Sequence, residues 1–598
     1  MSETNIKIRE EILERIPKEA ELSRIEFEGP RIAIYTKRPE VLVEKSYIIT
    51  EIVNRIRKRI VVRSDPSVRL PEHETEKMIS TIVPPEAEIT SILFDPTVGE
   101  VVVEARKPGL VIGRNGGILQ EIIKATRWRV RVLRNPPIRS TIIANTRYYL
   151  SKESKERERI LRTIGERIFR PAIFKTDDIV ITALGGFQEV GRSALFVQTK
   201  ESRVLLDCGI NPGSGKPEEA FPHLDVDLFD LEMLDAVVVS HAHLDHCGFV
   251  PFLYKYGYDG PVYCTEPTAS LMALLQLDYL DVMSREGVVP PYDQKDVRGT
   301  ILHTLPLRTG VVTDLTPDIR LTLHNAGHIL GSAIAHLHIG EGLHNIVYTG
   351  DFKYEHTMLF ESAATSFPRV ETLVIESTYG GTDDFMPPRR DAEKKFVAII
   401  NGTLGAGGKV VIPLPAVGRA QEIMLVLDHY MRLGKLTEAP IYIDGMIGEA
   451  TAIHTAYPEY LAREVRERIF HQGINPFQSE YFVNVNHPST RQEIIEGEPS
   501  IILTTSGMLE GGPSIEYFKH LAPDERNMML FVSYQIRGTL GRRVRSGARE
   551  VRRINPRPER IIVSHGEPGK ISDLVNTLRK KYKYDAYALG ILETMRLK

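Results

Sequence analysis

The feature that most constrains this chain is a six-residue run, HAHLDH (241–246), that contains four potential metal ligands. The apolar segment DAVVVS before it predicts a strand that delivers His241 and His243 to one side of an extended chain. Asp245 and His246 follow in a predicted turn, where they can face a second ion. Imidazoles and carboxylates at this density are typical of a dinuclear zinc site. A polar loop without a metal does not explain four such residues in six positions.

Three further candidate ligands stand at the ends of later apolar segments. His328 lies in NAGHILGSA, whose glycines leave room for backbone close to an ion. Asp351 ends NIVYTGD and can bridge two ions through its two oxygens, and His565 ends RIIVSHGE. Each alone would more often be a capping or hydrogen-bonding residue, but with the first run they predict one complete site. His336 and His338 have the same spacing as the first pair but no following acid, which indicates ordinary strand surface.

These segments, together with LLDCG earlier in the chain, resemble the successive motifs of the metallo-β-lactamase fold. The resemblance implies an α/β fold of the αββα sandwich type that binds two Zn²⁺. It implies that one zinc is held by His241, His243 and His328 and the other by Asp245, His246 and His565. It also implies that Asp351 bridges the ions, that Asp207 steadies the ligands from behind, and that Asp207 and Asp245 serve catalysis.

A pair of zinc ions lowers the pKa of a water molecule between them and clamps the attacked phosphate, an arrangement used for in-line phosphodiester cleavage. The metal ligands alone do not choose the substrate, because lactone and thioester hydrolases share them. The rest of the sequence has to narrow the substrate.

After Asp351, VIESTYGG (374–381) is similar to the acidic motif that opens the β-CASP insert, with Glu376 as its catalytic acid. PAVGRAQEIM and TTSGMLEGGPSIEYF resemble internal motifs of that insert, and SHGE resembles its closing histidine motif. β-CASP proteins are nucleases in which the insert caps the zinc cleft to form a strand-binding channel. We expect Ser506 and Gly507 to open a helix that offers backbone N–H groups to a phosphate, and Arg419 to add a contact. The alternative for these glycines is plain turn chemistry.

Residues 1–145 show one rhythm twice, a helix, two strands and a second helix, which predicts two related α/β units. In the first unit the second helix is predicted over residues 44–60. In the second unit Gly113-Arg114-Asn115-Gly116 resembles the GxxG loop of a KH domain, which brings backbone against RNA phosphates. The first unit has no GxxG and resembles a KH domain without that clamp. A closing strand (127–134) alternates basic and apolar residues, which predicts one buried and one positive face.

Charge and composition add limited constraints. Residues 101–170 hold 17 Lys and Arg against 6 Glu, in a chain of net charge −3, which indicates a phosphate-binding face. The alternative is a solvated helix, which residues 152–170 would fit. The charged start is not a secretory signal, and no apolar run predicts a membrane span. Three cysteines cannot form a disulfide framework and indicate a reducing cytoplasm: Cys208, Cys247 and Cys264.

At 598 residues the chain is too long for a single core. Nearly all of it resembles the archaeal homologues of the nuclease subunit of the cleavage and polyadenylation specificity factor. The predicted domains are a KH-like domain (1–70), a KH domain (71–145), a basic helical linker (146–178), a metallo-β-lactamase domain in two parts (179–379 and 552–598) and a β-CASP domain between them (380–551).

The resemblance implies a zinc-dependent endoribonuclease that cleaves single-stranded RNA in 3′-end formation and transcription termination. It further implies 5′→3′ exonuclease trimming, a homodimer formed through the C-terminal region, and contact with RNA polymerase. The sequence motifs give no preference for one RNA sequence over another.

The sequence departs from the family at one motif. β-CASP nucleases carry a further histidine motif, of the type F-S-(A/G)-H-x-D, shortly before the closing HGE. Here that place falls near Arg543, no histidine lies between His520 and His565, and several dozen residues read as missing near Val551–Arg552. Loss of this general acid, the partner of Glu376, typically costs about 10²–10⁴-fold in rate. Three explanations are open: the gene has lost the segment, the expressed protein lacks it, or the sequence leaves out disordered residues. We favour an omission, because the set of predicted metal ligands is otherwise complete.

Two other functions stay open. The absent histidine motif allows a non-catalytic RNA-binding subunit that recruits partners to transcripts. A small-molecule metallohydrolase with accessory N-terminal domains is the third alternative, but an insert of the β-CASP type would roof over the cleft and argues against it.

Overall fold

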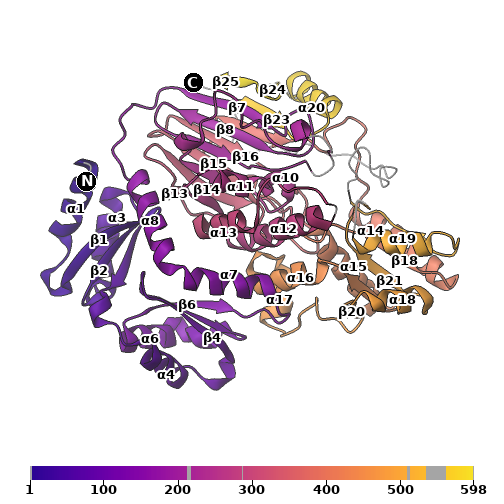
Figure 1. Ribbon diagram of the computed structural model, residues 1–598, viewed down its shortest axis with the longest axis horizontal. Coiled ribbons are helices and arrows are strands. Elements are labelled where there is room, and N and C mark those ends of the chain that lie inside the picture. Colours follow the sequence, from indigo (N-terminus) through magenta and orange to yellow (C-terminus); the bar gives the residue numbers. More distant parts are fainter. Residues whose placement is uncertain are drawn as a thin grey trace.

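The computed structural model describes residues 3–211, 214, 217–285, 287–507, 509, 512–533, 560–582 and 584–596. Figure 1 shows two N-terminal units at the lower left, two stacked sheets above, and a further α/β unit at the lower right. No helix in these ranges is long and apolar enough to cross a membrane. The predicted gap at Val551–Arg552 lies outside the described residues.

The first unit is built on a three-stranded sheet of order β1-β2-β3. Its elements are α1 (Glu3–Arg15), β1 (Leu22–Glu28), β2 (Arg31–Thr36), α2 (Pro39–Glu44), α3 (Ser46–Ile56) and β3 (Ile60–Ser64). The helix predicted over 44–60 is therefore wrong at both ends. Arg57 caps α3 in the left-handed conformation, at φ 53°. The β-branched residues after it pair with β2 in parallel, because tertiary pairing outweighs the helical periodicity.

The second unit repeats this order, with the sheet order β4-β5-β6. Its elements are α4 (Glu72–Ile82), β4 (Ile89–Asp95), β5 (Glu100–Ala105), α5 (Pro108–Ile112), α6 (Gly117–Thr126) and β6 (Arg129–Arg134). As in the first unit, the first two strands are antiparallel and the last two are parallel. The GxxG loop lies between α5 and α6 as a short 3-10 turn, η4 (Arg114–Gly116).

Two linker helices, α7 (Thr141–Lys152) and α8 (Ser154–Ile168), join these units to the rest of the molecule. The solvated-helix alternative holds for only one face of α8. Lys155, Arg159 and Arg162 are exposed, whereas Ile160, Ile164 and Ile168 are buried. Helix α7 begins against the lower-right unit, where Ser140 Oγ and Ile142 N donate to the Glu449 carboxylate at 2.6 and 3.0 Å. The linker is therefore a packed element that contacts several units.

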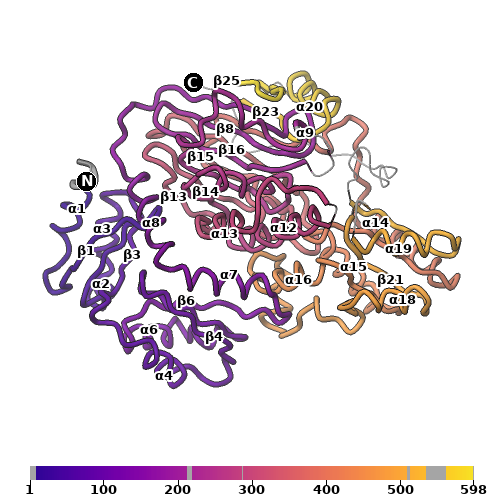
Figure 2. Tube along the Cα trace, viewed as in Figure 1, coloured from indigo at the N-terminus to yellow at the C-terminus, as the bar shows by residue number. Residues whose placement is uncertain are grey.

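The upper part consists of two seven-stranded sheets. The first has the order β12-β11-β10-β9-β8-β7-β25 and contains β7 (Ile179–Gly185), β8 (Ala194–Thr199), β9 (Arg203–Leu206), β10 (Ala236–Val238), β11 (Val262–Thr265), β12 (Thr304–Leu307) and β25 (Thr594–Arg596). The second has the order β13-β14-β15-β16-β17-β23-β24 and contains β13 (Thr313–Asp314), β14 (Ile319–Asn325), β15 (Ala333–Ile339), β16 (His344–Tyr348), β17 (Thr372–Glu376), β23 (Arg560–Ser564) and β24 (Asp585–Ala588). Figure 2 shows the yellow C-terminal segment returning to the purple strands of the first sheet, where β25 pairs with β7.

Helices cover the outer faces of both sheets. Apolar residues of the two inner faces, such as Val204 and Leu321, form a shared core. On the first sheet lie α11 (Val250–Lys255), α12 (Glu266–Arg285) and α13 (Gln294–His303). The short helices α9 (Pro217–Ala220) and α10 (Leu244–Cys247) belong to the connections after β9 and β10. On the second sheet, α20 (Pro568–Lys580) packs on strands β17 and β23. This layering confirms the predicted αββα sandwich.

The lower-right unit is inserted between β17 and β23, which are neighbouring parallel strands. It has a parallel sheet of order β20-β19-β21-β18-β22. Its strands are β18 (Val410–Pro413), β19 (Ile441–Asp444), β20 (Phe482–Asn484), β21 (Ile501–Thr504) and β22 (Met528–Met529). Its helices are α14 (Arg389–Gly405), α15 (Arg419–Arg432), α16 (Ile447–Ala456), α17 (Arg463–Phe470), α18 (Ser489–Glu496) and α19 (Pro513–Leu521). Because the chain leaves and returns at one sheet position, the insert does not interrupt the sandwich.

The packing of α8 on β1 can be tested with a pair of glycine variants. A Cβ at Gly165 would lie 2.7–2.9 Å from Phe27, partly from its backbone, whereas a Cβ at Gly402 in α14 would meet nothing within 4 Å. We expect Gly165→Ala to destabilise the protein by about 1–3 kcal/mol through overpacking. Gly402→Ala should stabilise it by about 0.5–1 kcal/mol through helix propensity. Urea denaturation checks both values, and equal effects of the two variants would contradict this packing.

Candidate metal centre

The candidate ligands converge at one edge of the two sheets. His241 and His243 follow β10, and Asp245 and His246 lie in the short helix α10 rather than in the predicted turn. His328 lies between β14 and β15, whereas Asp351 follows β16 and His565 follows β23. Strands of both sheets thus end at the same place, which is where layered α/β folds collect polar groups.

The structure brings all seven candidate ligands together. Ligand atoms lie within 4.8 Å of one another in three groups: His241, His243 and His328; His241, His246 and Asp351; and Asp245, His246 and His565. Asp351 lies between the other two groups. One of its oxygens is 3.4 Å from His246 Nε2 and 3.1 Å from His565 Nδ1, and the other is 3.8 Å from His328 Nε2. This is the arrangement that a bridging carboxylate needs.

The chemistry of these donors fits a pair of metal ions. Among the described residues, five buried ligand atoms make no hydrogen bond of good geometry: Nε2 of His241, His243 and His246, Oδ1 of Asp351 and Nδ1 of His565. Burying unpaired polar atoms is costly, so a cluster of them in a single place requires a compensating ligand. Imidazole nitrogens mixed with carboxylate oxygens are donors that Zn²⁺ accepts.

Charges inside the centre shift the pKa values in opposite directions. Burial lowers the pKa of His565, but the carboxylates of Asp351 and Asp245 outweigh it and raise that pKa to about 10. Burial raises the pKa of Asp245, but His246 and His565 bring it down to about 2. Burial lowers the pKa of His328 to about 3. The candidate ligands of the two predicted ions therefore differ in the absence of metal. His328 favours the neutral imidazole, whereas Asp245 and His565 favour a charged ion pair.

Asp207 supports the ligands from behind through a buried hydrogen-bond network. Its Oδ2 accepts from His246 Nδ1 at 2.7 Å, from Tyr348 OH at 2.8 Å and from Ser240 Oγ at 2.8 Å, while its Oδ1 accepts from Ser240 N at 2.7 Å. His246 Nδ1 is thereby engaged, which directs Nε2 toward the centre. Such a partner fixes the orientation and tautomer of a histidine that binds metal.

Glu376 ends β17 and is buried next to the centre. It is the partner of Ser564 across the β17–β23 pair, so it neighbours the strand end that carries His565. Its Oε2 accepts a hydrogen bond of 2.7 Å from Thr378 N. The place predicted for the absent histidine, near Arg543, lies outside the described residues.

The segment 415–418 of the insert contacts the metal loops directly. Gly418 lies against Ile329, the residue after His328, and a Cβ at Gly418 would come within 2.6 Å of Ile329 Cγ2. The Val417 backbone is close enough to His243 to raise the pKa of that imidazole, against a larger lowering by burial. The insert therefore covers the centre from one side.

The predicted phosphate contacts of the insert have different outcomes. Arg419 is the first residue of α15 and is exposed. The prediction that Ser506 and Gly507 open a helix is wrong, since the next helix, α19, begins at Pro513. Gly507 instead allows close packing, because a Cβ there would lie 2.7 Å from Pro415.

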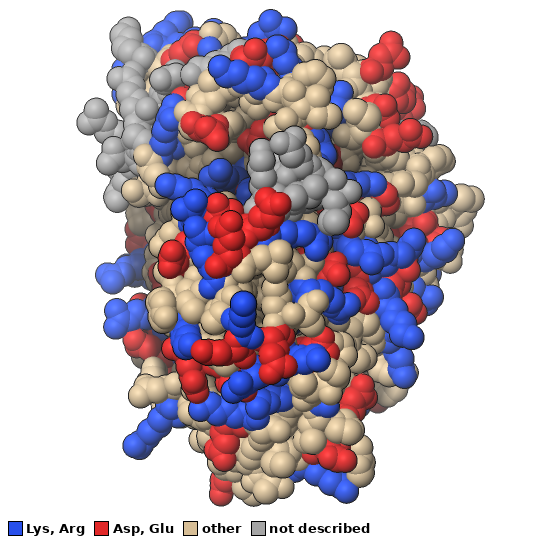
Figure 3. All heavy atoms as spheres, turned by 90° about the vertical axis from the view of Figure 1, so that its left-hand side faces the viewer, with Lys and Arg blue, Asp and Glu red and all other residues tan. Residues whose placement is uncertain are grey.

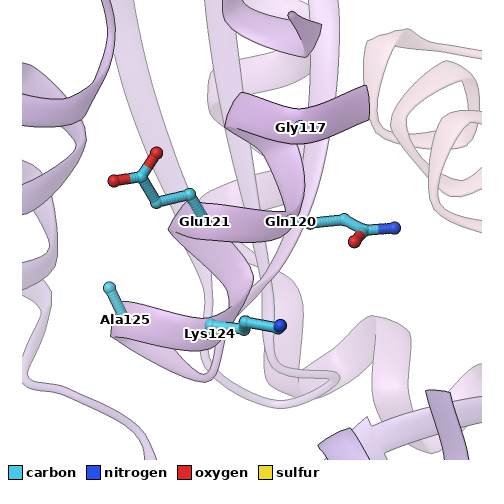
Figure 4. Close-up of a pocket in the computed structure, with 5 residues that line it drawn as sticks. All are labelled: Gly117, Gln120, Glu121, Lys124 and Ala125. Carbon is cyan, nitrogen blue, oxygen red and sulfur yellow. The ribbon is translucent and has the colours of Figure 1, made fainter. Parts of the chain in front are cut away.

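The GxxG loop is formed as its glycines require. Gly113 and Gly116 adopt φ 74° and 77°, and a Cβ at Gly113 would lie 2.8 Å from the Ile118 side chain. Arg114 and Asn115 are exposed. On the helix that follows, a pocket of about 510 Å³ is lined by Gly117, Gln120, Glu121, Lys124 and Ala125. In Figure 4, Gln120 and Lys124 point to the same side of α6.

The positive face predicted for strand 127–134 is largely used in contacts between units. Arg131 forms an ion pair of 2.6 Å with Glu266, and the Arg134 guanidinium lies 5.0 Å from the ring centroid of Phe470. Arg129 lies 3.8 Å from Glu100. Figure 3 shows basic side chains interleaved with acidic ones on the face that includes the first unit. The charge excess therefore does not form one open basic face there.

The pair His336 and His338, predicted to be ordinary strand surface, is placed differently from the prediction. His336 is buried rather than on the strand surface, and it lies between His324 and His338, with ring centroids 5.6 and 4.1 Å away. His338 is partly buried, and its two ring nitrogens are 2.7 Å from Asn345 Oδ1 and 2.9 Å from Thr322 Oγ1. Neither histidine belongs to the metal centre.

Three residues near the centre were not predicted from the sequence. Tyr348 and Ser240 bind Asp207, and Gly418 packs on the loop of His328. Tyr348 stands in the motif that ends at Asp351, which was a usable signal. Nothing in the local sequence of Gly418 indicates a contact with a residue about ninety positions earlier.

The sequence matches three family descriptions. Residues 2–69 match the KH domain of "Transcription termination factor FttA", residues 188–399 match the metallo-beta-lactamase superfamily, and residues 420–544 match the Beta-Casp domain. These matches confirm the predicted combination of a KH domain, a metallo-β-lactamase fold and a β-CASP insert.

Full-length relatives are similar over the entire chain. The proteins named Transcription termination factor FttA are 50% identical in Methanothermobacter thermautotrophicus, over 100% of both chains, and 51% identical in Thermococcus kodakarensis, over 99% of this chain and 98% of the relative. The one from Pyrococcus horikoshii is 51% identical over 99% and 97%. The first match spans 634 positions, but this chain has 598 residues, so about 36 positions have no counterpart here.

The pKa of His565 gives a pH-dependent prediction. Its pKa is raised from 6.5 to about 10, so its stabilising ion pairs are complete below pH 6.5 and are lost as the pH rises toward 10. Zinc needs the neutral imidazole, so binding must release this proton. Burial lowers the pKa of His246, but Asp351, Asp245 and Asp207 likewise raise it well above 6.5, so this imidazole must also lose a proton. Between pH 6.5 and 9 we therefore expect zinc affinity to rise at least about tenfold per pH unit, since each proton released contributes a factor of about ten. Competition with a chromophoric chelator measures it, and a flat profile would contradict the prediction.

Proposed function

Since the chain belongs to the family of transcription termination factor FttA, we propose that it is a zinc-dependent endoribonuclease that cleaves single-stranded RNA in 3′-end formation and transcription termination. The observation that carries the proposal is the convergence of seven candidate ligands next to a β-CASP insert, and five of these ligands have a buried atom that makes no hydrogen bond of good geometry within the described residues. The products would be 3′-hydroxyl and 5′-phosphate ends, with 5′→3′ exonuclease trimming as a further activity.

The position of each candidate residue suggests its role. His241, His243 and His328 would hold one zinc, Asp245, His246 and His565 the other, and Asp351 both. Zinc bound there supplies Lewis acidity to the phosphodiester and lowers the pKa of water. Asp207, which is itself held by Tyr348, keeps His246 in one orientation, and Val417 of the insert lies beside His243. Glu376 is the acid that would pair with the absent histidine.

RNA binding is assigned to the exposed loop at Arg114 and to Lys124 on α6, with Arg419 at the insert. A GxxG loop lets the backbone approach phosphates, and the basic side chains add charge. The proposal includes a homodimer formed through the C-terminal region, contact with RNA polymerase, and a cytoplasmic location.

A non-catalytic RNA-binding subunit is the second candidate. It is favoured by one observation, the lack of a histidine between His520 and His565 together with the roughly 36 positions that the relative has in excess. In that case the metal would be structural, since zinc can stabilise a fold without catalysis.

Removal of a ligand tests catalysis. With the absent segment restored from a relative, the chain should cut labelled U-rich single-stranded RNA when zinc is present. His241→Ala should lower the rate by more than about 100-fold, because loss of a ligand costs more than loss of its hydrogen-bond partner. The exposed His471→Ala is the matched control and should cut normally.

The same assay separates the two candidates. Tight RNA binding without zinc-dependent cleavage by the restored chain would exclude the nuclease and leave the binding subunit. Cleavage by the restored chain but not by the chain of 598 residues would assign the missing step to the absent histidine.

RNA contacts are tested by charge reversal. Arg114→Glu combined with Lys124→Glu should weaken binding of single-stranded RNA and reduce the slope of log affinity against log salt by about 1–2, since each phosphate contact contributes about 0.7. Lys295→Glu, an exposed position on α13, is the control with the same type of charge change. An unchanged salt slope in the double variant would place the RNA elsewhere.

A further inference from the structure

The segment 415–418 connects β18 to α15 and is held from two sides. On one side a Cβ at Gly507, after β21, would lie 2.7 Å from Pro415, and Leu414 N donates to Thr504 O at 2.9 Å. On the other side Gly418 contacts Ile329 of the metallo-β-lactamase domain. The segment is therefore wedged between its own sheet and the loop that carries a metal ligand.

Gly418 tolerates no side chain, for two separate reasons. Its backbone has φ 81° and ψ −69°, and Arg419 N donates to Val417 O at 3.1 Å. This is a γ-turn of positive φ, a rare and strained conformation that suits glycine. A Cβ would also lie 2.6 Å from Ile329 Cγ2 and 3.3 Å from its Cβ. Both the backbone and the surrounding space are specific for glycine.

The loop on the other side has little room to retreat. Ser332 Oγ accepts from both His328 N and Ile329 N, at 3.0 and 3.2 Å, so the two residues move as one turn. Behind this turn, a Cβ at Gly331 would lie 2.5 Å from Thr265 Oγ1. Ile329 itself is 3% exposed. A displacement of Ile329 would therefore also displace His328.

A second contact ties the same helix to the metal loops. Glu422, in the first turns of α15, accepts hydrogen bonds from Met358 N at 3.0 Å and Leu359 N at 2.9 Å. These amides belong to the chain that follows Asp351. Helix α15 and the turn before it thus contact the loops of two candidate ligands, His328 and Asp351.

We propose that Gly418 is a positioning residue for the metal centre: through Ile329 it sets the place of His328, so that zinc affinity depends on the β-CASP insert. The inference rests on the metal site proposed above. It assigns to the insert a role in building the centre, in addition to covering it.

The test measures zinc affinity, not RNA cleavage. Gly418→Ala should weaken zinc binding by about 10–100-fold in competition with a chromophoric chelator, the range seen when a residue that supports a metal ligand is lost. Gly434→Ala is the control at the other end of α15, because it also has a positive φ, 63°, but nothing lies within 4 Å of its Cβ. It should bind zinc within about threefold of the native chain.

A double variant separates contact from backbone strain. Ile329→Ala removes the colliding Cγ2, so Gly418→Ala with Ile329→Ala should recover at least about tenfold of the affinity lost by Gly418→Ala alone, since residues in contact are not additive. Native affinity in Gly418→Ala, or a double variant no better than the single one, would overturn the proposal. Absence of zinc binding by the native chain would instead refute the metal site itself.

If Gly418→Ala fails to fold, a milder variant, Glu422→Gln, still tests the proposal. This substitution adds no heavy atoms. The amides of Met358 and Leu359 bind different carboxylate oxygens, so the glutamine keeps an acceptor for only one of them. We expect it to weaken zinc binding by at least about threefold, with Glu464→Gln, an exposed position on α17, as its control. Equal affinity of these two variants would count against coupling between α15 and the centre.

Discussion

The metal centre depends on one buried carboxylate, Asp207. A buried charge is costly unless hydrogen bonds compensate it, and Asp207 accepts four. Its partners come from the ends of β10 and β16 and from α10, so the network joins the two sheets where the ligands gather. The chain turns at Asp207 itself with φ 60°. The sandwich and the centre are therefore stabilised by the same interactions, and neither is expected to form without the other.

The ligands could be predicted because each stands where an apolar strand meets polar residues, and a strand end is a local signal. His328, Asp351 and His565 all follow this pattern. The strand at Ile60 could not be predicted in the same way, since its residues also continue the helical period of α3 and only pairing with β2 decides. The role of Gly418 depends on the position of Ile329 in another domain, which no local pattern contains.

The count of charged residues shows where the basic residues lie along the chain, but not what they bind. The basic stretch, residues 101–170, covers the second half of the second KH unit and the two linker helices α7 and α8. Yet Arg131 is paired with Glu266, and Arg157 donates to the carbonyls of Leu302 and Thr304 at the end of α13. A sequence does not distinguish an arginine that is available to bind a phosphate from one that contacts another domain. The acidic or carbonyl partner of the second kind is distant along the chain.

The order of strands has a consequence for biosynthesis. The first sheet is closed by β25 and the second receives β23 and β24, all of which follow the β-CASP insert in the chain. Domains tend to fold from the N-terminus while the ribosome is still at work. The KH units can thus mature on the nascent polypeptide, whereas the sandwich must wait with unpaired edges until translation delivers His565 and the last strands. The KH units are in this way complete before all residues of the candidate metal centre have been synthesised.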